Sequence, residues 1–154
     1  METKKQFTTN YFDTLVEVAV DTKVSCGTKP SSKGNKKTVA ERQYELLITN
    51  PYKFTSDELF FLLFAEKNNL PETEYKQERE KFFSKGQPCF RASPLTKIYG
   101  FGIHSDGNGK VAMFGMETEQ YKQMQDDPKI KKVKALRTSK NSLSNLKTSV
   151  NVEK

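Results

Sequence analysis

The stretch from Ile98 to Met116 constrains the fold more than any other part of the chain. In both of its halves, apolar residues alternate with small or polar residues, a pattern typical of strands with one buried face. The halves are separated by Ser-Asp-Gly-Asn-Gly at 105–109, and Gly and Asn tolerate the positive φ angles of tight turns. The stretch therefore predicts a β-hairpin.

Two further stretches carry strand patterns. From Tyr11 to Asp21, β-branched and apolar residues alternate with others, which predicts a strand with one well-buried face. Residues 130–137 alternate loosely between apolar and basic side chains, which predicts an edge strand or a short helix, with lysines discouraging contact with other chains.

Helix signals occupy the middle of the chain. Thr38-Val39-Ala40-Glu41 has the form of a capping box and predicts a helix to about Thr49, which the Asn50-Pro51 pair ends. A second capping signal at 55–58 precedes the apolar run 59–65. That run could be a buried strand, but the cap and its lack of β-branched residues favour a helix.

Weaker signals fill the remaining segments. Pro71 predicts a third helix to about Ser84, and Glu117 to Gln125 a fourth. Ser93 followed by Pro94 predicts one short helical turn, and residues 87–92 could form a short strand.

These segments predict a fold of the α+β class. We expect a small antiparallel sheet, made of the N-terminal strand and the 98–116 hairpin, packed against about four helices. A single domain should span residues 8–137. Residues 1–7 are polar, and residues 138–154 are rich in Ser, Asn and Lys without a periodic pattern, so both ends are expected to be disordered.

Composition excludes several classes. No apolar run approaches the roughly 20 residues needed to cross a bilayer, and the N-terminus lacks the apolar region of a secretory signal. The two cysteines, Cys26 and Cys89, lie far apart and are expected to be reduced thiols. These features predict a soluble, cytoplasmic protein.

The net charge of +7 resides in the C-terminal segment. Residues 128–154 hold eight basic side chains and one acidic side chain, an excess that equals the whole net charge, so the rest of the chain is balanced. Nucleic acid is therefore a possible partner through the basic residues after 128, although a basic tail without aromatic residues suggests such binding only weakly. The residues concerned are Lys129, Lys131, Lys132, Lys134 and Arg137.

A second group of basic residues lies in a loop. The Gly-, Pro- and Ser-containing segment 22–37 carries Lys29, Lys33, Lys36 and Lys37, which could contact phosphate. A solvated surface loop is the more ordinary explanation.

Several segments resemble a known family. The segments TTNYF, KKTVAERQYELL, NPYKFTSDEL and, most specifically, RASPLTKIYGFGIH are similar to a family of short bacterial and fungal proteins that is catalogued as a domain of unknown function. The resemblance covers about residues 8–137. It implies a single soluble domain and assigns no catalytic residue.

The most plausible binding site lies in the same stretch. Gly100 and Gly102 share one predicted strand face and leave it without side chains. Such a face allows either a helix or a ligand to approach the backbone closely. Donors near this face could bind a carboxylate or phosphate, or could serve ordinary structural contacts. The predicted ligand-binding residues are Arg91, Ser93, Lys97, Gly100, Gly102 and His104.

Catalytic and metal chemistry have little support. Cys89 and His104 could form a nucleophile–base pair, but no third supporting group is identifiable, and such a cysteine is more often a buried apolar residue. One histidine and two separate cysteines do not give the paired ligand spacing of zinc, and the 106–117 segment lacks calcium ligands at the required positions. We expect no metal and no cofactor.

Three functions follow in order of preference. The first is a cytosolic, non-enzymatic binding module for a small anionic ligand or a protein partner. The second is a nucleic-acid-associated regulator that uses the basic C-terminal segment. The third is an enzyme that uses Cys89 and His104.

Overall fold

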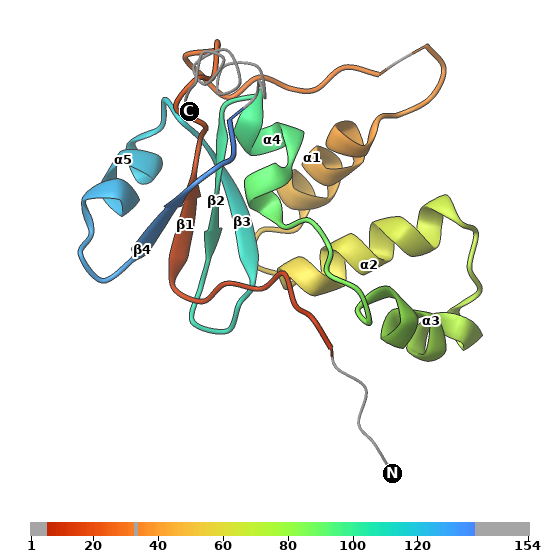
Figure 1. The fold of residues 1–154 in the computed structure, drawn as a ribbon. Helices are drawn as coiled ribbons and strands as arrows, with labels where there is room; N and C mark the ends of the chain where they lie inside the picture. Colours follow the sequence, from red (N-terminus) through yellow and green to blue (C-terminus); the bar gives the residue numbers. More distant parts are fainter. Residues whose placement is uncertain (1–5, 33, 138–154) are drawn as a thin grey trace, which may run out of the picture.

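A four-stranded sheet organises the molecule (Figure 1). The computed structural model describes residues 6–32 and 34–137. The strands β1 (Thr14–Glu17), β2 (Phe101–Ser105), β3 (Val111–Gly115) and β4 (Lys131–Lys134) lie in the order β3-β2-β1-β4. The predicted hairpin is confirmed, because β2 pairs antiparallel with β3 in a register that joins Phe101 to Gly115 and Ser105 to Val111.

The sheet is mixed, whereas the sequence predicted an antiparallel one. β1 is antiparallel to β2, but β4 is parallel to β1. Parallel pairing requires a crossover, and α5 (Glu119–Asp126) supplies it between β3 and β4. The prediction of an edge strand in 130–137 is confirmed by β4. β1 is shorter than predicted and is buried on both faces, because it lies between β2 and β4 with helices on both sides.

The helices begin where the capping signals lie. α1 (Val39–Thr49) is capped by Thr38, whose side chain accepts from the Glu41 amide, and α2 (Ser56–Lys67) has a complete capping box between Thr55 and Glu58. The run 59–65 is therefore helical, as predicted. The remaining helices are α3 (Tyr75–Phe82), which follows a 3₁₀ turn at Glu72–Glu74, and α4 (Pro94–Lys97), with Ser93 as its N-cap.

The prediction of a short strand at 87–92 is wrong. The segment contains a 3₁₀ turn at Phe90–Ala92. Its backbone bonds are local, since the Ala92 amide donates to the Cys89 carbonyl and the Ser93 amide to that of Phe90. Pro88 has no amide to donate to a neighbouring strand.

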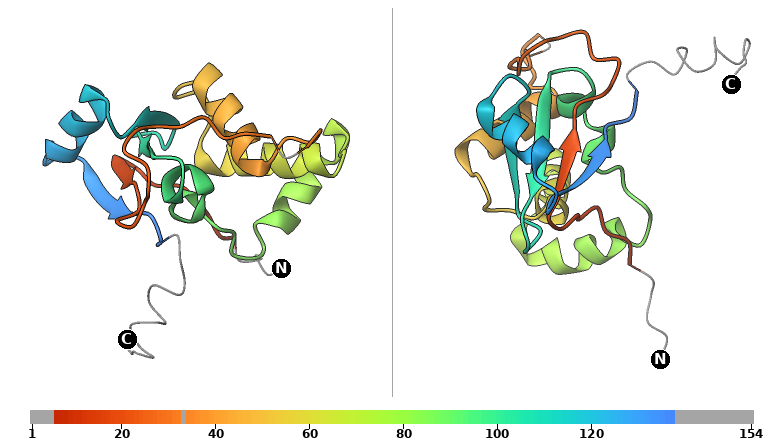
Figure 2. Two further views of the ribbon diagram at one scale, coloured as in Figure 1. Left: turned by 90° about the horizontal axis from the view of Figure 1, so that it is seen from above. Right: turned by 90° about the vertical axis from the view of Figure 1, so that its left-hand side faces the viewer.

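Helices cover both faces of the sheet. Figures 1 and 2 show α5 on one face and α1 and α4 on the other, with α3 beyond α2. The main core lies on the α1–α4 side and includes Val16, Leu59, Phe90, Leu95 and Ile103. A smaller core joins Leu15 and Val18 to Tyr121 of α5, and a third joins α2 to α3.

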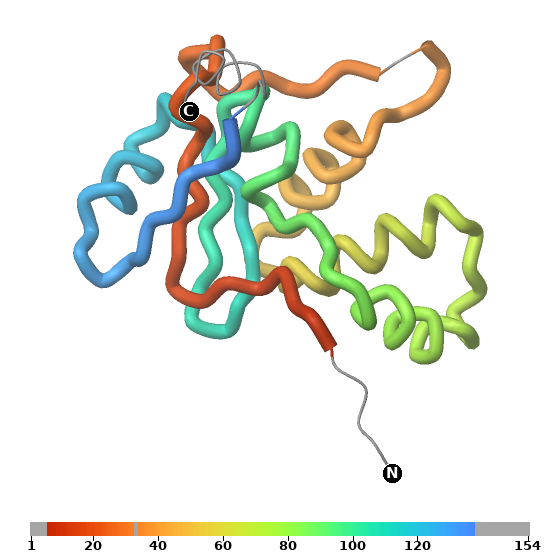
Figure 3. The backbone as a smooth tube through the Cα atoms, in the orientation of Figure 1, coloured from red at the N-terminus to blue at the C-terminus, as the bar shows by residue number. Residues whose placement is uncertain are grey.

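The connection from β1 to α1 runs across one end of the molecule. Figure 3 shows this segment passing from the end of β1 over the sheet to the start of α1. It is mostly exposed, but Pro30 is buried, and the Thr28 amide donates to the Tyr99 carbonyl at 2.8 Å. Lys36 and Lys37, at the end of this segment, lie beside the N-terminal end of α1.

The predicted ends of the domain are covered only in part. Of residues 1–7, Gln6 and Phe7 are described, and both hydrogen-bond to backbone carbonyls at the end of α3. Residues 138–154, predicted to be disordered, lie outside the described residues. In the described part of the chain, no helix combines the length and the apolar character needed to span a membrane.

Candidate ligand-binding groove

An apolar cavity of about 290 Å³ lies between α1, α2 and the segment 87–94. Its walls include Phe60, Leu63 and Phe64 of α2, with Pro88 and Pro94 opposite. The cavity follows from the composition of α2, whose run 59–65 is apolar on every side. The core buries Leu59 and Phe61, but Phe60, Leu63 and Phe64 stay only partly buried, and their surfaces become the cavity wall.

Two of the polar side chains in this wall are almost fully buried. Gln43 of α1 is 3% exposed, and Ser93 is 4% exposed. The Ser93 hydroxyl donates to Oε1 of Gln43 at 2.6 Å, and Ser93 Oγ also accepts from the Leu95 amide. Ser93 therefore joins α1 to the start of α4 at the bottom of the cavity.

A second, basic cavity of about 570 Å³ adjoins the first at the N-terminal end of α1. Lys36, Lys37, Arg42 and Lys67 line it, together with Glu66. Val39, Leu63 and Lys67 line both cavities. We call the two cavities together the α1–α2 groove, which is apolar at one end and basic at the other.

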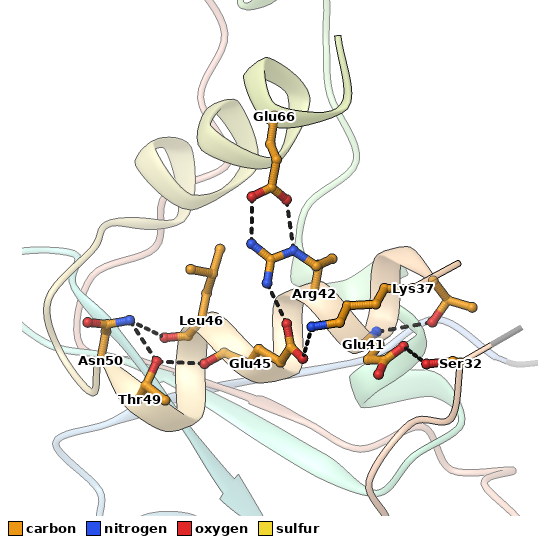
Figure 4. Close-up of polar contacts among 10 residues, drawn as sticks. Ser32, Lys37, Glu41, Arg42, Glu45, Leu46, Thr49, Asn50 and Glu66 are labelled. Carbon is orange, nitrogen blue, oxygen red and sulfur yellow. Dashed lines mark hydrogen bonds and ion pairs between the residues drawn. The ribbon is translucent and has the colours of Figure 1, made fainter. Parts of the chain in front are cut away.

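Part of the basic charge is already neutralised (Figure 4). Arg42 reaches from α1 to α2 and donates to both carboxylate oxygens of Glu66, at 2.7 and 2.6 Å, and it also pairs with Glu45. Lys37 donates to Glu45 at 2.7 Å. These contacts raise the pKa of Arg42; Lys37 and Arg42 lower the pKa of Glu45, and Arg42 lowers the pKa of Glu66.

Two cations of the groove keep their charge available. Among the described residues, Lys36 and Lys67 form no ion pair, and both are exposed. Lys67 is also a wall residue of both cavities, so its ammonium group can meet an anion at the entrance to the apolar part.

Cys89 is a further wall residue of the apolar cavity. It is a free, partly buried thiol whose Sγ lies 3.5 Å from the Tyr11 hydroxyl. Burial, followed by the contact with Cys89, raises the pKa of Tyr11 to about 12, so this phenol is protonated at neutral pH. Cys26, the other thiol, is also free and is exposed.

The six predicted ligand-binding residues do not meet at one site. Ser93 lines the groove, but the Arg91 Nε donates to the Lys134 carbonyl at 2.6 Å and so holds β4. Lys97 lines a separate cavity of about 250 Å³ with Lys23, Val24 and Ile98. The assignment of the six residues to ligand binding stays a prediction, and Ser93 is the member that the groove includes.

The glycine face is covered by protein. Gly102 lies on the α5 side of β2, and a Cβ at this position would be 2.3 Å from the Tyr121 ring. Gly100 precedes β2 with a φ of +79°, and a Cβ there would be 2.6 Å from the Cys26 carbonyl oxygen. Close packing by α5 and by the 22–37 loop therefore explains these glycines, and they do not floor an open pocket.

His104 and Cys89 belong to different surroundings. His104 shares a hydrogen bond of 2.8 Å between Nδ1 and the Tyr52 hydroxyl, and the two rings meet edge to face. Burial lowers the pKa of His104, against the weaker opposite effect of Asp106 and Asp13. Among the described residues no hydrogen bond joins Cys89 to His104, and each side chain contacts a different tyrosine.

Several of the basic residues predicted to contact nucleic acid lie on β4. Lys132 Nζ is folded back onto the Asp127 and Ile130 carbonyls, and Lys134 lies 3.3 Å from a Glu17 carboxylate oxygen. Lys129, Lys131 and Arg137 are exposed. Binding of nucleic acid stays a prediction. No group of three or more potential metal-ligating side chains occurs within residues 6–32 and 34–137.

Sequence reasoning found some wall residues and missed others. The sequence indicates Lys36 and Lys37 as possible phosphate contacts and Ser93 as a ligand-binding residue. Phe60, Leu63 and Lys67 were missed as site residues. The apolar run 59–65 was the sequence signal for these residues. When a helix is apolar on every side, one core cannot bury all of its side chains, and some stay available to line a cavity.

The comparisons with known proteins identify a family. Residues 6–141 match DUF6157, a family of unknown function, so the chain belongs to that family. No curated protein and no solved structure matched the chain.

Proposed function

We propose that the chain is a non-enzymatic binding module for a small anionic ligand with an apolar body, held in the α1–α2 groove. The observation that carries the proposal is the shared wall formed by Val39, Leu63 and Lys67, which joins an apolar cavity to a basic one. Small-molecule sites are mostly apolar hollows of about 300–1,000 Å³ with a few placed polar groups, and the groove has this character.

The charge of the groove supports an anion. Glu45 and Glu66 occupy Arg42 and Lys37, while Lys36 and Lys67 have no ion-pair partner among the described residues. A carboxylate or phosphate bound at the basic end would form ion pairs with Lys36 and Lys67. An apolar chain extending from it would cover Leu63, Phe60 and Phe64 and remove their surface from water.

Calorimetric titration with three probes tests the proposal. We expect octanoate to bind, acetate to fail because it has no apolar body, and octanol to bind more weakly because it has no charge. In Lys67→Gln, octanoate affinity should fall by about two- to fivefold, the effect of one exposed ion pair.

Lys122→Gln is the matched control. Lys122 is an exposed lysine of α5, on the opposite side of the sheet, so its substitution should leave octanoate affinity unchanged. The proposal is wrong if octanoate does not bind, or if both lysine variants weaken it equally.

A further inference from the structure

Gln43 carries a side-chain amide that is only partly hydrogen-bonded within the part of the chain that the structure describes. Its Oε1 accepts from Ser93, but among the described residues its Nε2 has no hydrogen-bond acceptor. The residue is 3% exposed. Leaving a buried hydrogen-bond donor without a partner costs about 1–3 kcal/mol of stability. Such donors are therefore rare in native proteins.

The contact with Ser93 fixes which way the amide faces. The Ser93 hydroxyl donates to Oε1 of Gln43 at 2.6 Å. The Ser93 oxygen is itself held by the Leu95 amide at 3.1 Å. The oxygen of the Gln43 amide therefore faces Ser93, and the two N–H groups of Nε2 remain for another partner.

The residue that carries this donor belongs to the wall of the apolar cavity. Gln43 and Ser93 both line that cavity, beside Phe60, Leu63 and Pro94. Gln87, the other glutamine of this wall, has its Nε2 bonded to the Phe82 carbonyl at 2.7 Å. Gln43 is thus the glutamine of this wall whose donor is open to a ligand.

We propose that the groove selects an anion whose apolar body carries an oxygen acceptor, such as a hydroxyl or carbonyl group, which binds Nε2 of Gln43. This inference rests on the proposed function and narrows its ligand class from simple fatty anions to oxygenated ones. A site that presents a buried donor rejects an analogue without the matching acceptor, because the donor is then left unpaired.

The experiment compares octanoate with a series of hydroxyoctanoates whose hydroxyl group lies at successive carbons. We expect one position to bind about two- to tenfold more tightly than octanoate, which corresponds to one net hydrogen bond. In Gln43→Met, which keeps the side-chain length and removes both donors, this preference should disappear.

Gln123→Met is the matched control, since it makes the same change at an exposed glutamine of α5, on the opposite side of the sheet from the groove. It should preserve the preference for the hydroxylated ligand. In two-dimensional NMR spectra of the unaltered protein, the Gln43 side-chain amide signals should shift more with the preferred isomer than with octanoate. This readout holds even if a variant folds poorly.

The outcomes separate the two proposals. If octanoate binds but no hydroxylated isomer binds more tightly, the oxygen-acceptor inference fails and the binding function stands. The inference also fails if the preference survives Gln43→Met. If neither octanoate nor any isomer binds, both proposals fall together.

Discussion

Single residues show how closely α5 packs on the sheet. Gly102 has no side chain, and the ring of Tyr121 fills the space that a Cβ would occupy. That ring has little freedom to shift, because Tyr121 is 3% exposed and its hydroxyl accepts from the Val18 amide at 3.1 Å. The glycine is therefore a packing requirement.

We predict that Gly102→Ala lowers the free energy of unfolding by about 1–3 kcal/mol, as overpacking of a filled core does. Gly86→Ala is the control, because a Cβ there meets nothing within 4 Å and the residue has no positive φ. Urea unfolding of both variants measures the difference. Equal stabilities would show that Tyr121 can move.

At His104 the environment sets a dependence on pH. Burial lowers the folded-state pKa below the unfolded value of about 6.5, so the unfolded chain takes up the proton first as pH falls. This contribution to stability is complete above the unfolded pKa, and it is lost between that value and the lower folded pKa.

The change in unfolding free energy between pH 7.5 and 5.5 tests this sign. We expect the unaltered protein to lose more stability over that interval than His104→Asn, which cannot take up the proton. Carboxylates that titrate in both proteins cancel in the comparison. A larger loss in the variant would contradict the assigned direction.

Among the elements, α2 carries the groove. By its apolar composition the run 59–65 could also form a strand. The capping box of Thr55 and Glu58 favours the helix. The same helix presents Leu59 to the main core, Phe61 to α3 and Leu63 to the groove.

Loss of the cap should weaken α2. We expect Thr55→Ala to lower the free energy of unfolding by about 1 kcal/mol, because the Glu58 amide loses its acceptor. Thr73→Ala, at an exposed threonine of the 3₁₀ turn at Glu72–Glu74, should change stability by less than about 0.5 kcal/mol. Thermal unfolding of the two variants gives the comparison, and similar midpoints would argue against the cap.

For the molecule as a whole, β4 is one of the two edge strands of the sheet and is also contacted from outside the sheet. The Arg91 guanidinium donates to the Lys134 carbonyl, and the Arg91 carbonyl accepts from the Leu136 amide. Arg91 therefore connects β4 to the segment that precedes α4.

Hydrogen exchange should reveal this connection. In Arg91→Ala, we expect the Ala135 amide, which bonds to the Glu17 carbonyl, to exchange about two- to tenfold faster. The central amide of Val16 should be unaffected, and so should every amide in the control Arg137→Ala, which alters an exposed arginine just after β4. An unchanged rate at Ala135 would mean that β1 alone holds β4.

The sequence by itself determined the local structure. Period-two alternation and the 105–109 turn defined the hairpin, and the residues around Thr38, Thr55 and Ser93 predicted where helices begin. These signals are reliable because each one satisfies backbone groups within a few residues. The α+β class followed from the order of such segments.

Only the tertiary structure decided which segments meet. The parallel direction of β4, the covering of Gly102 by Tyr121 and the joining of Val39, Leu63 and Lys67 in one groove all depend on contacts between residues far apart in the chain. A local sequence pattern indicates how much apolar surface a helix or strand carries, but it does not indicate which neighbouring element covers that surface. The apolar run of α2 can be recognised in the sequence. Which of its side chains remain partly exposed in the groove depends on how α2 packs against its neighbours.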